Sequence, residues 1–345
     1  YNGVPFSALG GIQALSGQKK NGKTFVLAQL MSAILSPRTM RMDEYLPGLR
    51  VPQRTLDHRG HEPTVLYVDT EMEKLNSAKV LRRVHWLCDW AMDVPNDRFH
   101  VLWLRGVTDA KNDEGKTEER AYQKRYRLIR LAIEMLHPDA VFIDGIRDII
   151  GDFNDNAESA QLVGDLMALA EERQICIWNT LHMNPRPGND DESKMRGHLG
   201  TELGNKITDT LVSIKSKTAE GVTFTVKQND ARGKDMEDWK FAVTEAAGAL
   251  GIPKIYGAPA PTDERPNTDD VEAIKAWIIE ADSRFNWPMT RKEVKKLVFG
   301  DIGGQNNATI QQADLQVAMN MHLLEESTVK KNGYYLLQPG QDLPF

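Results

Sequence analysis

Short apolar runs alternate with segments of helical apolar spacing from Gly11 to about residue 258. The apolar runs predict strands at residues 12–16, 64–68, 100–104, 140–143, 175–178, 210–214, 222–226 and 239–243. The helical spacing predicts helices at residues 25–35, 76–90, 117–136 and 157–173. Strands that alternate with helices are typical of an α/β domain with a mainly parallel sheet. The last three strands are expected to extend that sheet, the later ones through hairpins.

A second domain is predicted beyond a segment rich in proline and small polar residues, 257–268, which has no periodicity and indicates a linker. The boundaries are therefore expected at 1–256 for the first domain and 269–345 for the second. In the second domain the pattern predicts helices at 271–281, after a capping Thr290 and at 308–323, then a hairpin over 328–337 around Asn332-Gly333. Three helices followed by a two-stranded ribbon are the order of a winged-helix domain.

Composition is that of an ordinary soluble protein: the 345 residues are 41% hydrophobic and 27% charged. No apolar run approaches the ~20 residues of a membrane span, and no signal-peptide pattern opens the chain. Cys88 and Cys176 lie in apolar contexts, which indicates reduced core residues of a cytoplasmic protein. The net charge of −6 argues against a uniformly basic nucleic-acid coat, although local basic patches remain compatible with it. Because the chain begins with Tyr1 and not Met, we expect a fragment of a longer protein.

Residues 17–24 match G-x-x-x-x-G-K-[ST], the phosphate-binding loop of NTPases, between a predicted strand and a predicted helix. The loop consists of Gly17, Gln18, Lys19, Lys20, Asn21, Gly22, Lys23 and Thr24. Its backbone N–H groups and the helix dipole would hold phosphate oxygens, with Lys23 on the β- and γ-phosphates and Thr24 on Mg²⁺. The alternative is a glycine-bearing turn before a helix. The motif predicts a protein that binds ATP with Mg²⁺.

Two carboxylates are expected beside this loop, because each follows a predicted strand of the same sheet. Asp144 closes the strand at 140–143, which is the position of a carboxylate that supports Mg²⁺; the alternative is a turn or helix-capping aspartate. Glu71 follows the strand that ends at Asp69 and is expected to activate the attacking water. Asp69 is the competing candidate for that role.

The order of phosphate loop, D-T-E-M, V-F-I-D and T-L-H-M-N resembles the RecA-like ATPases, with the DnaB-type and plasmid RepA-type ring helicases the most similar. The resemblance covers roughly the first three quarters of the chain. It implies a catalytic Glu71, a magnesium-associated Asp144 and a sensor role for His182, which would link the γ-phosphate to nucleic-acid-binding loops. Without the resemblance, a lone histidine after a strand is as well explained by a structural role.

The same resemblance implies residues that reach the neighbouring subunit's nucleotide. The stretch from Lys227 to Lys234 resembles the family's K-Q-R-N-G, with three extra residues before the arginine, so Lys227 and Arg232 are the finger candidates. On the residues alone this is a solvated basic turn. The loop after the sensor strand departs from a DNA-lining loop, because residues 190–192 are three consecutive acids that repel phosphates. Lys194 and Arg196 are the cations left there to contact DNA.

Further nucleic-acid candidates in the second domain are Arg291, Lys292, Lys295, Lys296, Lys330 and Lys331, for which solvated surface or protein docking is the alternative. The resulting hypothesis is an ATP-driven DNA motor or helicase that forms a ring homo-oligomer, expected to be a hexamer, and acts on single-stranded or duplex DNA. It would serve replication or mobility of a plasmid-like element. The alternatives are an ATP-switched DNA-binding regulator and an ATPase scaffold that binds protein and not DNA.

Overall fold

The computed structural model describes residues 1–2, 4–36, 39–52, 60–183, 194–207, 209–218, 221–230, 235–256, 289–290, 324–326 and 333–336. The chain divides into two compact units. The larger unit comprises Phe6–Pro47 and Glu62–Gly257, and the smaller comprises Tyr1–Pro5, Gly48–His61 and Ala258–Phe345.

The larger unit is an α/β structure. Its strands are β1 (Ile12–Gly17), β2 (Val65–Asp69), β3 (Phe99–Trp103), β4 (Ala110–Lys111), β5 (Thr117–Glu119), β6 (Ala140–Asp144), β7 (Cys176–His182), β8 (Thr210–Thr218), β9 (Gly221–Asp230), β10 (Trp239–Thr244) and β11 (Ile252–Tyr256). Its helices are α1 (Lys23–Leu35), α2 (Met40–Tyr45), α4 (Lys74–Leu87), α5 (Ala121–Leu136), α6 (Asn156–Arg173), α7 (Gly197–Lys206) and the short 3-10 helices η1 (Ile146–Ile149) and η3 (Gly248–Leu250).

Nine strands form one sheet in the order β11-β10-β9-β8-β1-β7-β6-β2-β3. The strands from β8 to β3 in this order pair in parallel, and β8, β9, β10 and β11 continue the sheet through antiparallel pairs. The prediction of a mainly parallel sheet with a hairpin extension is therefore confirmed. Strand β11 was not predicted, and β7, β8 and β9 continue beyond their predicted ends because their polar residues also join the ladders.

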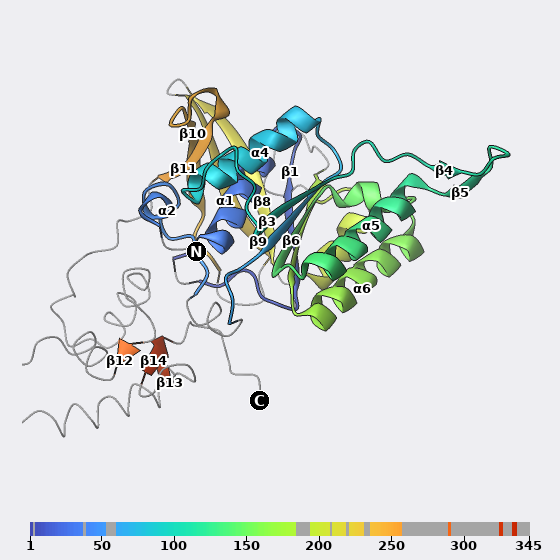
Figure 1. Cartoon of the computed structure of the whole chain (residues 1–345). Helices are drawn as coiled ribbons and strands as arrows, with labels where there is room; N and C mark the ends of the chain where they lie inside the picture. The colour runs from blue at the N-terminus through green and yellow to red at the C-terminus, as the bar shows by residue number, and fades with distance from the viewer. Residues whose placement is uncertain are drawn as a thin grey trace, which may run out of the picture. The chain divides into compact units, whose positions relative to one another are not determined.

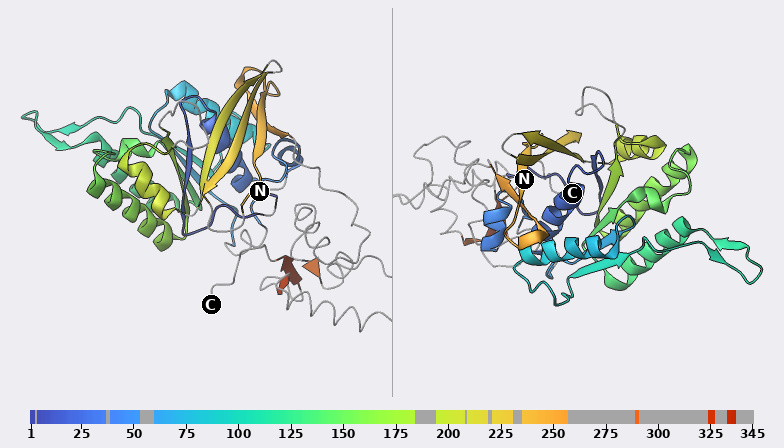
Figure 2. Two further views of the ribbon diagram at one scale, coloured as in Figure 1. Left: turned by 180° about the vertical axis from the view of Figure 1, so that it is seen from behind. Right: turned by 90° about the horizontal axis from the view of Figure 1, so that it is seen from above.

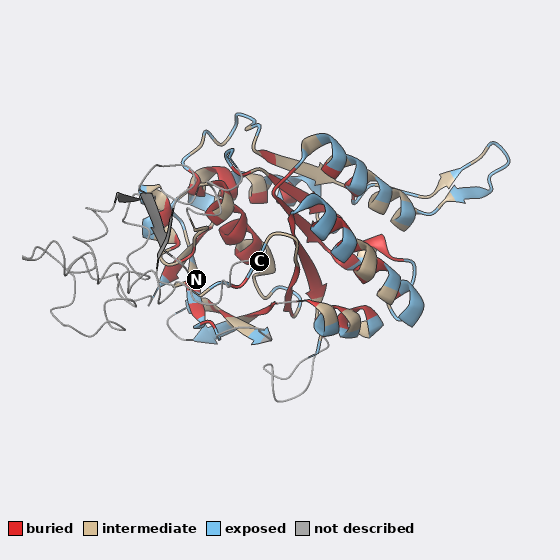
Figure 3. Cartoon of the chain, turned by 90° about the horizontal axis from the view of Figure 1, so that it is seen from below, coloured by how far each residue is buried: buried red, intermediate tan, exposed pale blue. Residues whose placement is uncertain are grey.

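Helices cover both faces of the parallel part (Figures 1 and 2). Helices α5 and α6 lie on one face, and α1 and α4 lie on the other. The first face is filled by aliphatic side chains of alternate strand positions, such as Ile12, Val68 and Val141, against Ile129 of α5 and Leu166 of α6. Figure 3 shows the resulting pattern, in which the strands are buried and the outward faces of the helices are exposed. Buried parallel strands with apolar residues on both faces explain the continuous apolar runs in the sequence.

The predicted helix at 117–136 is wrong at its beginning. Thr117–Glu119 is strand β5, which pairs with β4, and α5 begins only at Ala121. Asn112 closes the turn between the two strands, since its Oδ1 accepts from the backbone N–H groups of Glu114 and Lys116. The two strands form an arm that projects from the body of the unit (Figure 1). Backbone pairing with β4 takes these residues out of the helix despite their polar, helix-compatible sequence.

The predicted helix at 76–90 is shifted toward the N-terminus, because α4 runs from Lys74 to Leu87. The chain leaves the helix at Asp89, which has a φ of 61°, and the backbone N–H of Trp90 donates to the carbonyl of His85. Both cysteines are free and buried, as expected for core residues.

In the smaller unit, β12 (Met289–Thr290), β13 (Leu324–Glu326) and β14 (Gly333–Leu336) form an antiparallel sheet in the order β12-β14-β13. The predicted hairpin over 328–337 is corrected, because β14 pairs with residues 324–326 in a register that sets Leu324 opposite Leu336. The linker and the three helices predicted after it lie outside the described residues, apart from the two residues of β12. No helix in the described ranges is long and apolar enough to cross a membrane.

Candidate nucleotide and active site

The phosphate loop joins the end of β1 to the start of α1, where the sequence predicted it. Gly22 is the N-terminal cap of α1 with a φ of 81°, and a Cβ on it would lie 2.6 Å from the ring of Phe224. A Cβ on Gly17 would lie 2.7 Å from the carbonyl oxygen of Ser213 on β8. The Ser213 hydroxyl in turn donates to the carbonyl of Asn21, so β8 supports the loop directly. Glycine is required at both positions, and the helix begins with backbone N–H groups that no side chain caps, as anion binding needs.

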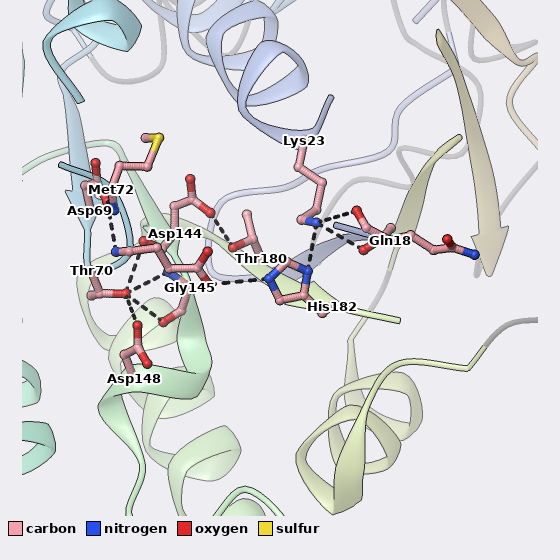
Figure 4. A network of polar contacts seen from close by, with 12 residues as sticks. Gln18, Lys23, Asp69, Thr70, Met72, Asp144, Gly145, Asp148, Thr180 and His182 are labelled. Atoms are coloured by element: carbon pink, nitrogen blue, oxygen red, sulfur yellow. Dashed lines mark hydrogen bonds and ion pairs between the residues drawn. The ribbon is translucent and has the colours of Figure 1, made fainter. Parts of the chain in front are cut away.

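The ammonium group of Lys23 lies over the loop backbone. It donates to the carbonyls of Gly17 at 3.0 Å and Gln18 at 3.1 Å, and Nδ1 of His182 lies 3.1 Å away (Figure 4). Burial lowers the pKa of Lys23, against the opposing effect of the Asp144 and Glu71 carboxylates. The loop residues Lys19 and Lys20 are exposed. Lys23 is thus the one lysine of the loop that points back into the site.

Glu71 and His182 are brought together from different strand ends. Nε2 of His182, the last residue of β7, lies 3.7 Å from Oε1 of Glu71. This contact is the main cause that lowers the pKa of Glu71, and the charges of Lys23 and Arg147 act in the same direction. Glu71 is therefore ionised at neutral pH. His182 joins the two expected catalytic residues, a position that favours a role in the site over a purely structural one.

The competing base, Asp69, has a different environment. Its side chain is fully buried, and Oδ1 accepts from the backbone N–H groups of Glu71 and Met72 at 3.0 and 2.8 Å. The Glu71 side chain is 40% exposed and faces His182. Asp69 therefore shapes the turn that carries Glu71, and the geometry favours Glu71 as the group that water can reach.

Asp144 is the last residue of β6, beside Asp69 in the sheet register. Its carboxylate accepts from the Thr180 hydroxyl at 2.6 Å and from the Tyr67 hydroxyl at 3.1 Å. Burial raises the pKa of Asp144 to about 6, although the hydrogen bond from Thr180 opposes this. Asp144 does not cap a helix, because the cap of η1 is Gly145 and no side-chain bond caps it. The alternative of a helix-capping aspartate is therefore wrong.

A polar link between the ends of β2 and β6 was not predicted from the sequence. The Thr70 hydroxyl accepts from the backbone N–H of Gly145 at 2.9 Å and lies 2.9 Å from Oδ2 of Asp148 (Figure 4). A Cβ at Gly145 would lie 2.6 Å from Oε1 of Glu71, so glycine leaves the room that the Glu71 carboxylate occupies. Thr70 adjoins the predicted Glu71 in sequence, but nothing in the pattern reveals its partner 75 residues away.

Two arginines lie against one aromatic ring beside this site. The guanidinium carbon of Arg147 on η1 is 4.3 Å from the ring centre of Phe153, and that of Arg196 is 5.7 Å from it. Arg196 is also tied to the sensor strand, because its backbone N–H donates to the carbonyl of His182 at 3.0 Å. Both arginines are exposed and form no ion pair with the residues that the structure describes. Neither Arg147 nor Phe153 was predicted as a site residue. Nothing in the sequence D-G-I-R-D around Arg147 indicates that this arginine lies on an aromatic ring.

The remaining predicted residues do not gather here in the same way. Lys194 is exposed next to the isolated bridge between Met183 and Met195. Lys227 lies within β9, opposite Val212 of β8, and not after the end of a strand, since β9 continues to Asp230. Arg232, Arg291, Lys292, Lys295, Lys296, Lys330 and Lys331, like the acidic loop, lie outside the described residues.

The donors present fit a magnesium ion held mainly by nucleotide. Mg²⁺ prefers hard oxygen ligands and usually takes only one or two from the protein, with phosphates and water as the others. Thr24 in the first turn of α1 and Asp144 at the end of β6 supply a hydroxyl and a carboxylate at this edge of the sheet. Among the described residues, no group of three or more His, Cys, Asp and Glu side chains is placed to hold a metal ion.

The parallel sheet, the phosphate loop at the end of β1 and the carboxylates on neighbouring strand ends define a RecA-like P-loop ATPase. Comparison with known families agrees. The profile of the AAA domain family matches residues 5–185, more than half of the 345 residues, and the chain belongs to that family. Family membership implies the use of ATP, usually with Mg²⁺.

Among solved structures, a KaiC-like protein from the hyperthermophilic archaeon Pyrococcus horikoshii OT3 is similar, with 13% sequence identity and a TM-score of 0.43. The match covers 72% of this chain and 90% of that chain. No curated protein sequence matches the chain.

Proposed function

We propose that this protein is an ATP-driven DNA motor of the helicase type, serving replication or mobility of a plasmid-like element. The observation that carries the ATP-hydrolysing part is the convergence of four side chains from four different segments of the chain. Lys23, Glu71, Asp144 and His182 meet at one edge of the sheet, beside a loop built to hold phosphates.

Each of these groups has a defined task in hydrolysis. The loop N–H groups and Lys23 would neutralise the phosphate oxygens. Thr24 and Asp144 would hold Mg²⁺, which would supply positive charge to stabilise the phosphates during hydrolysis. Glu71 is ionised and partly open to water, so it can accept the proton of a water that attacks the γ-phosphate. The Thr180 and Tyr67 hydroxyls keep the Asp144 carboxylate fixed in direction.

The DNA part of the proposal is supported by the arginine pair on Phe153. Exposed guanidinium groups stacked on an aromatic ring are pre-oriented donors for phosphate oxygens, and the ring limits their freedom. The hydrogen bond from Arg196 to the carbonyl of His182 connects one of them to the residue next to Lys23 and Glu71. A movement of His182 on hydrolysis would therefore be passed to a DNA-contacting arginine through a single backbone hydrogen bond.

The proposal includes a ring of six copies, in which Lys227 and Arg232 of one subunit complete the ATP site of the next. It also includes a winged-helix domain after the linker, whose six basic residues named above would add DNA contacts. Both parts rest on the resemblance to ring helicases and on the sequence of those segments.

A different observation favours a second candidate, an ATPase that acts on a protein partner. Residues 190–192 follow the sensor strand as three consecutive acids, and like charge repels a phosphate backbone. A basic protein surface would suit that loop better than DNA. In a third alternative, the protein is a nucleotide-switched regulator that binds duplex DNA without unwinding it.

Steady-state ATP hydrolysis with and without single-stranded DNA, together with a strand-separation assay, distinguishes the three. DNA-stimulated turnover with ATP-dependent unwinding supports the motor. Duplex binding with unchanged turnover and no unwinding supports the regulator, and turnover without any DNA binding supports the protein-directed ATPase. The Glu71→Gln variant is the control, because it removes the proton acceptor while it keeps the shape of the side chain.

A further inference from the structure

Glu71 lies two residues beyond the end of β2, where the ladder with β6 has ended. A general base must lie within hydrogen-bond reach of the water it activates, so the turn that carries Glu71 has to be fixed in place. Asp69 fixes it from within, because its Oδ1 accepts from the backbone N–H groups of Glu71 and Met72. A second attachment leaves the turn altogether and runs through the side chain of Thr70.

The Thr70 hydroxyl makes this attachment in both directions. Its oxygen accepts from the backbone N–H of Gly145 at 2.9 Å. Its one proton has three acceptors in reach: Oδ2 of Asp148 at 2.9 Å, and the carbonyls of Asp144 and Gly145 at 3.2 Å each (Figure 4). The carboxylate is both the nearest and the strongest of these acceptors, so the proton points to Asp148. The hydroxyl therefore joins the turn after β2 to η1.

The same hydroxyl fixes the peptide against which the Glu71 carboxylate lies. A Cβ on Gly145 would be 2.6 Å from Oε1 of Glu71, so the carboxylate packs directly on this glycine. Thr70 thus sets two things at once, the residue that precedes Glu71 and the backbone that its carboxylate contacts. A change in the direction of the hydroxyl would shift the carboxylate in the site.

Asp148 is itself held from the opposite side. Its backbone carbonyl accepts from Nη1 of Arg125 on α5 at 3.2 Å. The other nitrogens of Arg125 donate to the carbonyls of Leu104 and Val107, in the segment that leads from β3 to the arm. Because one guanidinium group ties η1 to α5 and to this segment, the Asp148 carboxylate is a fixed acceptor for the Thr70 hydroxyl.

We propose that Asp148 is a positioning residue for Glu71, acting through the Thr70 hydroxyl. This inference rests on the proposed ATP hydrolysis and adds a residue to the same reaction. Asp148 raises the turnover number because it holds the base in line, and it leaves the affinity for ATP unchanged. A purely structural link would behave differently, since its loss would not depend on whether residue 71 can accept a proton.

Steady-state ATP hydrolysis by the full chain tests the proposal. Asp148→Ala removes the acceptor and should lower kcat about 10- to 100-fold, since a misplacement of about 1 Å can cost about 10²-fold. KM for ATP should stay within roughly twofold, because binding is not affected. Asp148→Asn keeps an acceptor oxygen without the charge and should lose less. In the Glu71→Gln background, Asp148→Ala should lower the residual rate no further, because the residue that it positions no longer acts as a base.

The matched control is a similar link between the same two strands at their opposite ends. Oδ2 of Asp139, just before β6, accepts from the hydroxyl of Thr64, just before β2, at 3.1 Å and from its backbone N–H at 2.7 Å. Thr64→Val removes the hydroxyl contact far from Glu71 along the strands. It should keep the wild-type kcat and KM, whatever it does to the unfolding midpoint.

The outcomes separate the inference from the function on which it rests. Absence of ATP turnover by the wild-type protein, or wild-type turnover by Glu71→Gln, overturns the proposed base and the inference together. Wild-type kcat for Asp148→Ala, with Glu71→Gln impaired, overturns the inference alone. Equal fold-losses from Asp148→Ala in both backgrounds also overturn it, because they assign the link a structural role. If Asp148→Ala does not fold, Asp148→Asn in the two backgrounds provides the same comparison.

Discussion

Replacement of Thr180 by valine tests whether the Thr180 hydroxyl keeps the buried Asp144 carboxylate ionised. Valine has nearly the shape of threonine, so the change removes the 2.6 Å hydrogen bond and leaves packing almost unchanged. The pKa of Asp144 is already raised from 3.8 to about 6, chiefly by burial. At about 1.4 kcal/mol per unit, the ionised carboxylate costs the fold about 3 kcal/mol at pH 8, where Asp144 is charged in both states.

A hydrogen bond to a charged group contributes about 1.5–3 kcal/mol, so Thr180→Val should raise the pKa of Asp144 by a further one to two units, roughly. The direction in which the unfolding free energy changes with pH follows from the linkage between proton binding and folding. A carboxyl whose pKa is higher in the folded state makes the protein less stable as pH rises through the interval between the unfolded and folded pKa. The variant extends that interval upward. It should lose about 2 kcal/mol of unfolding free energy at pH 8 and much less at pH 5, where folded Asp144 is protonated.

Denaturant unfolding at the two pH values measures this difference, with Thr210→Val as the matched control. Thr210 on β8 is also buried, but its hydroxyl has no hydrogen-bond partner among the described residues. Loss of that hydroxyl should be neutral or slightly stabilising at both pH values. A Thr180→Val cost that is the same at pH 5 and pH 8 would refute the assignment, because packing alone has no such pH dependence.

Three further predictions concern the loop, the base and the arginine pair. Glu71→Gln should lower steady-state turnover by about 10²–10⁴-fold while nucleotide binding persists, since only proton transfer is lost; unchanged turnover would exclude Glu71 as the base. Gly22→Ala forces a Cβ to within 2.6 Å of Phe224 at a φ of 81°, and should cost about 1–3 kcal/mol in thermal or denaturant unfolding; a neutral result would mean that the loop relaxes without strain. Arg147→Ala and Arg196→Ala should each weaken single-stranded DNA binding and reduce the slope of log K against log salt by about 0.7; an unchanged slope would remove the arginine from the DNA contact.

The fold, the phosphate loop with Lys23 and the strand-end Asp144 were predictable because their signals are local in sequence. A buried parallel strand is a continuous apolar run, and the first polar residue after it marks the strand end, as Asp144 does. After the strand at 64–68 this rule left Asp69 and Glu71 as competing candidates; the resemblance to ring helicases supported Glu71 and supplied the sensor role of His182. The phosphate loop needs glycine at two positions for steric reasons, so the spacing of these two glycines makes the loop recognisable in the sequence.

What was missed depends on contacts between distant segments. The two strands of the arm have polar sequences, and only their pairing with each other separates them from α5. Thr70 meets Gly145, and Arg147 meets Phe153, through chain folding that no periodicity records. Lys227 was expected beyond a strand because the apolar alternation ends at Val226, whereas the backbone ladder with β8 continues through polar residues to Asp230.

The position of β8 has a consequence for where the protein can be shortened. The family profile ends at residue 185, but β1 pairs with β8 on one side and β7 on the other. A chain cut at residue 185 would turn the central strand of the phosphate loop into a sheet edge, prone to pair with other chains. It would also lose Ser213, which holds Asn21 and closes the space around Gly17. A piece that keeps both neighbours of β1 therefore extends at least through β8 to Thr218, well past the segment by which the family is recognised.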